Sequence, residues 1–186
     1  MAKKNVTRRY VAFLRGVNLG KRRVKMDHLR DLFTALKFAN VSTFIASGNV
    51  IFEAPDADAA GVETRIEAHL HQALGYEVET FLRTAAELAV VAAFRPFAAE
   101  ELEAPGRTLH VGFLRDAPAD AAAGKLLALR TSVDDFHVHG RELYWLCRGN
   151  FSDSLVPWPV LAKVVGTATV RNVTTVRKLA ALCPPS

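Results

Sequence analysis

Positive charges and small polar residues gather in the segment that follows the first apolar stretch of the chain. The sequence FLRGVNLGKRRVK, residues 13–25, contains five cations, two glycines and one asparagine. Glycines let backbone N–H groups approach a ligand closely, and arginine and lysine side chains add formal positive charge. This composition predicts a site for an anion. The stretch GVNLGK matches neither GxxxxGK[ST] nor GxGxxG, so neither of these nucleotide-binding motifs is present.

A second polar segment with chemical potential lies near the end of the chain, in TATVRNVTT. Asn172 or Thr169 is placed to cap the last predicted helix, which puts Arg171 at the positive end of that helix. A cation is unfavourable there unless something negative lies nearby. An anionic ligand and an acidic side chain of the chain itself both satisfy this requirement.

Arrangements typical of metal binding or covalent catalysis are weak. His137 and His139 alternate along one predicted strand, and His110 lies on another strand about 9–10 Å away, two inter-strand spacings. We therefore expect no metal site and no cofactor. Cys147 and Cys183 are the only cysteines and are not spaced as a redox or zinc motif, so we expect two free thiols in a reducing compartment.

Charge is distributed unevenly along the chain. Residues 1–26 contain nine basic side chains and residues 154–186 contain four, and neither segment has an acidic residue. Because the whole chain has 24 basic and 19 acidic residues, the part between these ends has a net charge of −8. Basic ends favour an anionic partner, although a solvated N-terminal arm is the simpler explanation for Lys3 and Lys4.

The composition is that of a globular protein with a sizeable core. The chain has 186 residues, half of them hydrophobic, and has no apolar run of about eighteen residues that could span a bilayer. The basic N-terminus is followed by an apolar run that Arg15 interrupts, which is typical of a strand and not of a signal peptide. We expect a soluble, cytoplasmic protein without a membrane partner.

The periodicity of apolar residues predicts the elements that position these groups. In the first half it indicates strands at 9–15, 41–46, 49–53 and 77–83, and helices at 26–37, from Asp56 to Gly75, and from a Thr84–Glu87 capping box to residue 93. This β-α-β-β-α-β order is that of the ferredoxin-like unit.

The second half repeats the same order. Strand 108–116, a helix from Pro118 to about 130, a hairpin around Gly140 and a helix at 154–164 precede a short last strand and a C-terminal helix. The predicted fold class is therefore α+β, with two tandem ferredoxin-like βαββαβ units, the second having an incomplete last strand and an extra C-terminal helix. The expected domains are residues 1–95 and 107–186.

Four segments resemble a known family. YVAFLRGVNLG, VKMDHLRDLFTALKF, NVSTFIASGNVIF and TATVRNVTTVRKL are similar to the bacterial domain of unknown function 1697 family, over nearly the whole chain. The family pattern favours glycine-rich sequence where this chain has Lys21, Arg22 and Arg23. The resemblance implies the fold and class, and it implies no activity, cofactor or catalytic residue.

The topology predicts that two polar segments meet. In a ferredoxin-like sheet the third strand lies beside the first, so the connection after the first strand and the hairpin turn emerge at the same end. The expected rim consists of Arg15, Gly16, Asn18, Gly20, Lys25, Ser47, Gly48 and Asn49. The alternative is structural, because these glycines also permit positive φ and these polar side chains also satisfy turn backbone.

We further expect the two basic ends to form one site, with Arg171 and Asn172 joining the rim. The function predicted first is that of a binding module for a phosphate-bearing anion, with nucleic acid as one candidate. The sequence leaves two alternatives open: an enzyme acting on a small anionic metabolite, and a scaffold or homo-oligomerisation protein without a ligand.

Overall fold

A computed structural model describes residues 7–55 and 58–185. The chain divides into two compact units: residues 1–89 together with 179–186, and residues 90–178. The helix α3 (Ala85–Ala93) leads from the first unit into the second, and α7 (Val173–Leu182) leads back. Within the described ranges, no helix is both long enough and apolar enough to cross a membrane.

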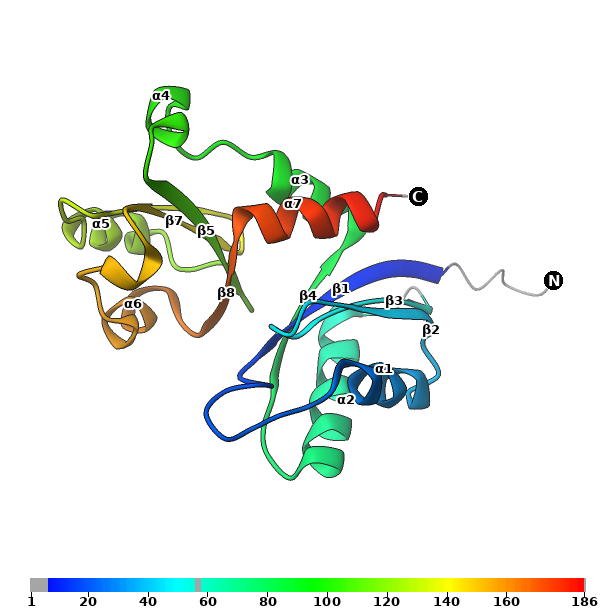
Figure 1. Ribbon diagram of the computed structural model, residues 1–186. Coiled ribbons are helices and arrows are strands. Elements are labelled where there is room, and N and C mark those ends of the chain that lie inside the picture. Colours follow the sequence, from blue (N-terminus) through cyan, green and yellow to red (C-terminus); the bar gives the residue numbers. More distant parts are fainter. Residues whose placement is uncertain (1–6, 56–57, 186) are drawn as a thin grey trace. The chain divides into compact units, whose positions relative to one another are not determined.

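The first unit contains one four-stranded antiparallel sheet and two long helices (Figure 1). Its elements are β1 (Thr7–Arg15), α1 (Met26–Ala35), β2 (Ala39–Phe44), β3 (Asn49–Pro55), α2 (Ala59–Leu74) and β4 (Glu79–Thr84). The strand order is β2-β3-β1-β4. The third strand lies beside the first, as predicted, and Phe13 of β1 pairs with Asn49 of β3.

The core of the first unit forms where α1 and α2 pack on one face of this sheet. Alternate residues of β1, including Tyr10 and Leu14, are buried against Phe33 of α1 and Ile66 of α2. Phe52 of β3 stacks on two aromatic rings of this cluster and contacts a third one edge-on. The apolar residues that alternate along the strands thus pack against the apolar residues that recur every three to four positions along the helices.

Local signals in the sequence account for several element ends. Gly75 ends α2 in the left-handed conformation, and Thr84 and Glu87 form the predicted capping box at the start of α3. The cap of α2 is Asp58, whose carboxylate accepts hydrogen bonds from two backbone N–H groups. The cap predicted at Asp56 lies outside the described residues.

The second unit contains a second four-stranded antiparallel sheet, with the order β6-β7-β5-β8. Its elements are α4 (Ala99–Glu103), β5 (Arg107–Leu114), α5 (Ala121–Ala128), β6 (Asp134–His139), β7 (Glu142–Arg148), the 3₁₀ helix η1 (Phe151–Asp153), α6 (Trp158–Val165) and β8 (Ala168–Asn172). The last strand, predicted to be incomplete, pairs with β5 at five positions, against six for β4 with β1.

The two sheets therefore share one strand order, which the repeated order of elements in the sequence indicated. Corresponding positions carry the same residue types: Val11 pairs with Arg83 in the first sheet, and Val111 pairs with Arg171 in the second. Both arginines are buried. The protein is a mixed α+β protein with two four-stranded antiparallel sheets.

Candidate functional site

The loop after β1 and the turn between β2 and β3 are joined by hydrogen bonds. The Asn18 side-chain amide donates to the carbonyl oxygen of Ala46 in the turn at 3.0 Å and to that of Val24 at 3.3 Å. In return, the Val24 N–H donates to the Asn18 Oδ1 at 2.6 Å. The predicted meeting of these two segments is confirmed, and Asn18 is the side chain that fastens them.

Gly48 allows the turn to lie directly against the loop. Its φ of +81° lies in the left-handed region, and a Cβ atom there would be 2.6 Å from Cγ1 of Val17 and 3.1 Å from Cβ of Leu14. The Leu14 N–H also donates to the Gly48 carbonyl oxygen at 2.8 Å. Only glycine satisfies both the backbone conformation and this close approach.

Three other residues of the predicted rim have partners inside the first unit. Asn49 is fully buried, and its amide donates to the Phe44 carbonyl oxygen at 2.9 Å and to the Ser47 hydroxyl at 3.0 Å. The guanidinium of Arg15 forms an ion pair with Glu79, its neighbour across β1 and β4. Polar groups expected to face a ligand thus hold the turn and the sheet edge together.

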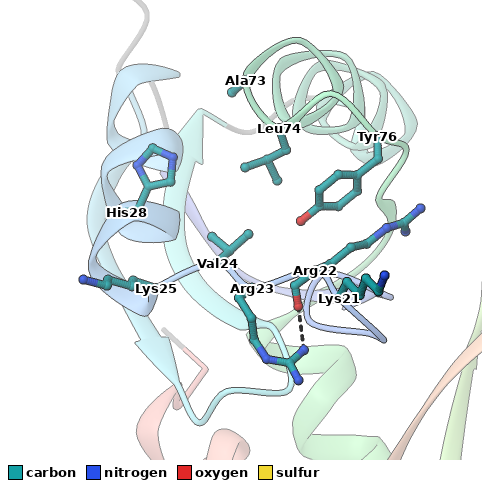
Figure 2. Close-up of a pocket in the computed structure, with 9 residues that line it drawn as sticks. All are labelled: Lys21, Arg22, Arg23, Val24, Lys25, His28, Ala73, Leu74 and Tyr76. Carbon is teal, nitrogen blue, oxygen red and sulfur yellow. Dashed lines mark hydrogen bonds between the residues drawn. The ribbon is translucent and has the colours of Figure 1, made fainter.

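An open pocket lies beside the basic part of the loop (Figure 2). Its volume is about 630 Å³. The nine residues that line it include four cations and no acidic residue. They are Lys21, Arg22, Arg23, Val24, Lys25, His28, Ala73, Leu74 and Tyr76.

Two of the arginines are positioned by contacts within this pocket. The guanidinium carbon of Arg22 lies 4.2 Å from the centre of the Tyr76 ring, a cation–π contact, and the Tyr76 hydroxyl donates to the Val17 carbonyl oxygen at 3.0 Å. Arg23 donates to the carbonyl oxygens of Gly20 and Arg22 at 2.9 and 2.7 Å, the second of which Figure 2 shows. These contacts join both arginines to neighbouring parts of the first unit.

The lysines of the pocket are available for a ligand. Lys21 and Lys25 are exposed, and within residues 7–55 and 58–185 neither side chain has an ion-pair partner. Lys25 is also the residue before the first turn of α1, where no side chain caps the helix. The positive end of the α1 dipole therefore lies beside the pocket. The acid in that turn, Asp27, pairs with Arg30 at 3.2 Å.

The second predicted segment, which contains Arg171 and Asn172, has a structural role. Asn172 caps α7, because its Oδ1 accepts a hydrogen bond from the Thr174 N–H at 2.8 Å. Arg171 is buried in β8 and donates to the Thr169 hydroxyl at 2.7 Å and to the Val170 carbonyl oxygen at 3.0 Å. Burial lowers the pKa of Arg171 to about 10. Both residues belong to the second unit.

Groups for metal or covalent chemistry do not gather in the described parts of the chain. Among those residues there is no cluster of three or more His, Cys, Asp or Glu side chains that could hold a metal ion. The His139 ring packs on that of Phe94, and the His110 ring packs on that of Phe151; the ring centroids are 4.2 Å apart in each pair. Burial raises the pKa of Cys147 to about 12, so this thiol is a poor nucleophile.

The pocket adds residues that the sequence prediction did not include in the rim. His28 and Tyr76 reach it from the first turn of α1 and from just beyond the end of α2. Tyr76 follows Gly75, which ends α2, and precedes β4, which begins beside the end of β1. Its position near the loop after β1 could therefore have been inferred from the predicted topology. The contact between Tyr76 and Arg22, 54 positions apart in the sequence, required the tertiary structure.

Comparison with known proteins identifies one family and one similar fold. The family model described as "Protein of unknown function (DUF1697)" matches residues 7–144. No curated protein matches the sequence. A solved structure, that of conserved bacterial protein SP0830 from Streptococcus pneumoniae, is similar with a TM-score of 0.72 and 17% identity. The similarity covers 96% of this chain and 99% of that chain, and at this identity it shows the fold alone.

Proposed function

The chain belongs to the DUF1697 family of proteins of unknown function, and we propose that it is a binding module for a phosphate-bearing anion. The observation that carries the proposal is the pocket whose lining includes Lys21, Arg22, Arg23 and Lys25 and no acidic residue. The proposed site lies closer to the basic part of the loop than the predicted rim does. Lys25 belongs to the predicted rim and also lines the pocket.

Electrostatic repulsion supports an anion at this position. Four cations occur within five consecutive residues, and two positive charges about 4 Å apart repel by about 1 kcal/mol even at the dielectric constant of water. The uncapped positive end of α1 adds to the same potential. A bound anion would relieve this repulsion.

The residue types favour phosphate over a single carboxylate. Arginine presents a planar fork of N–H donors that fits phosphate oxygens, and lysine adds a mobile point charge. A volume of about 630 Å³ is within the range of small-molecule sites. Several cations together match a multiply charged group, such as pyrophosphate or neighbouring phosphates of a nucleic acid.

The other residues of the rim take supporting roles in this proposal. Asn18 and Gly48 hold the loop against the turn, and Ser47 and Asn49 order the turn itself. Gly16 has a φ of +74° at the point where the chain leaves the sheet, next to Arg15. The loop that carries the cations is thereby fixed at both ends.

We also interpret both units as ferredoxin-like. The sequence placed the division between them at residues 95–107, whereas the compact units divide after residue 89 and again after residue 178. The shared strand order and the repeated β-α-β-β-α-β order of elements support this interpretation. Both cysteines are free and buried, which fits the reducing cytoplasm as the location of the protein.

Calorimetric titration at constant ionic strength tests the proposed function. The ligands are pyrophosphate, phosphate and a short single-stranded oligonucleotide, with chloride as the reference ion. The variant Lys21→Ala/Lys25→Ala removes two exposed cations that have no ion-pair partner among the described residues, and we expect it to weaken pyrophosphate binding by at least about tenfold. The matched control, Lys125→Ala/Lys163→Ala, removes the same charge from exposed positions of the second unit.

Equal losses in the two variants would show that net charge, and not this pocket, attracts the anion, and the proposal would then be wrong. Arg15→Ala and Arg171→Met address the expectation that both basic ends form one site. That expectation requires each variant to remove most of the stabilisation by phosphate. Sulfate strengthens proteins generally through exclusion from their surface, so it is not a suitable probe without these variants.

A further inference from the structure

Two aliphatic side chains are exposed beside the basic loop. Leu19 is 69% exposed and Ile45 is 49% exposed. Leu19 lies in the loop after β1 and Ile45 in the turn between β2 and β3. The hydrogen bond between Asn18 and Ala46, the residues adjacent to these two, places both side chains on the same joined pair of segments.

The backbone at Ile45 is in a conformation that this residue type rarely adopts. Its φ is +52°, in the left-handed region where glycine and asparagine are favoured and a β-branched residue is an outlier. Glycine at this position would make the folded state more stable, and asparagine would make the protein more soluble. An exposed isoleucine here therefore indicates a use for the side chain outside the fold.

The chemistry around these residues defines the partner. The loop that carries Leu19 continues into Lys21, Arg22 and Arg23, and the Arg22 N–H donates to the Leu19 carbonyl oxygen at 3.1 Å. The partner must therefore present negative charge and apolar matter together. Nucleic acids present aromatic bases, which stack on aromatic side chains, whereas the exposed side chains here are aliphatic.

Anionic lipids present phosphate at the surface and acyl chains just below it. Figure 1 shows the connection between β1 and α1 as an open loop that extends away from the sheet of the first unit. A projecting loop with aliphatic and basic side chains suits entry into such a boundary. This inference departs from the expectation of no membrane partner, which rested on the absence of an apolar run long enough to span a bilayer.

We propose that the basic tip, defined as Leu19, Ile45 and residues 21–25, docks on an anionic lipid surface. Leu19 and Ile45 enter the boundary between headgroups and acyl chains, and the cations meet headgroup phosphates. This association is peripheral. The lipid inference rests on the proposed function in one respect, because the same cations bind phosphate in the pocket and at the lipid surface.

Co-sedimentation of the full-length protein with vesicles tests this inference. The vesicles are phosphatidylcholine with roughly 30% phosphatidylglycerol, and pure phosphatidylcholine is the reference. We expect binding to the anionic vesicles only. The variant Leu19→Ser/Ile45→Gly should reduce the partition coefficient by about tenfold, because the apolar area that enters the membrane is lost.

The matched control is Leu127→Ser/Val160→Ser, which alters side chains that are 52% and 38% exposed in the second unit. We expect it to bind vesicles as the unaltered protein does. Ile45→Gly alone should leave the melting temperature unchanged or raise it, because glycine accepts a φ of +52°. Loss of vesicle binding in that variant would then not be due to unfolding.

The outcomes separate this inference from the proposed function. Pyrophosphate binding that persists without any vesicle binding overturns the lipid inference alone. Vesicle binding that depends on Leu19 and Ile45 in a protein without pyrophosphate affinity overturns the pocket proposal alone. Full vesicle binding by Leu19→Ser/Ile45→Gly shows that lipid is not the partner of the tip. The same conclusion follows if the unaltered protein does not bind vesicles and this variant loses about tenfold in affinity for the oligonucleotide.

Discussion

Gly48 provides the most direct test of how the turn packs on the basic loop. Replacing it by alanine imposes two separate penalties. The first is the left-handed backbone at φ +81°, which is unfavourable by about 1–2 kcal/mol for a residue with a Cβ atom. The second is the contact of that Cβ atom with Val17 Cγ1 at 2.6 Å, and overpacking of this kind is unfavourable by about 1–3 kcal/mol.

Gly20→Ala is the matched control. Gly20 has a φ of +63°, but a Cβ atom there would have no neighbour within 4 Å. Alanine also lowers the entropy of the unfolded chain, which offsets about 0.4–1 kcal/mol in both variants. We therefore expect Gly48→Ala to lower the free energy of unfolding by about 2–4 kcal/mol and Gly20→Ala by about 1 kcal/mol or less.

Urea unfolding measures both variants, and the double variant Val17→Ala/Gly48→Ala isolates the contact. Removing Cγ1 of Val17 makes room for the new methyl group, so the two substitutions should be non-additive by about 1 kcal/mol or more. Equal destabilisation by Gly48→Ala and Gly20→Ala, together with additivity in the double variant, would refute the described packing of turn against loop.

Three further predictions concern buried groups. Cys147 and Cys183 should not react with a thiol reagent at about pH 8 in the folded protein and should both react in urea, since burial raises the pKa of each thiol; rapid labelling of the native state would contradict this. Burial lowers the pKa of His110 below 6.5, so the unfolded chain binds this proton more tightly than the folded chain does. Stability from His110 is thus present above about pH 6.5 and lost as the pH falls below it, and urea unfolding should show a shallower acid dependence for His110→Leu. Asp134→Ala should lower the free energy of unfolding by about 3 kcal/mol or more, because Trp145, Thr131 and the Leu155 N–H lose their shared acceptor; thermal unfolding close to that of the unaltered protein would show that these hydrogen bonds contribute little.

Much of the fold could be read from residues close together in the sequence. The Thr84–Glu87 capping box and the end of α2 at Gly75 were predicted from spacing and residue type, and both are present. The repeat of the element order predicted that the second half would resemble the first, and the two sheets share one strand order. Element ends shifted by a few residues, as with α6, which begins at Trp158 and not near Ser154.

The sequence indicated the loop after β1 as a candidate site, but it did not distinguish residues that could meet a ligand from residues that support the loop. Asn18, Asn49 and Arg15 have residue types suited to a ligand, and each proved to have a partner within the first unit. The pocket residue Tyr76 was missed. A polar side chain in a loop has the same sequence signature whether it binds a ligand or a neighbouring backbone group.

The sequence by itself determined the order of elements, their caps and the excess of positive charge in the loop, because each of these depends on residues a few positions apart. Only the tertiary structure decided that Arg15 faces Glu79, that Arg22 lies on Tyr76 and that Gly48 touches Val17. Those contacts join residues 64, 54 and 31 positions apart. They arise from strand register and packing, which depend on all the residues of the core together and not on neighbours in the sequence.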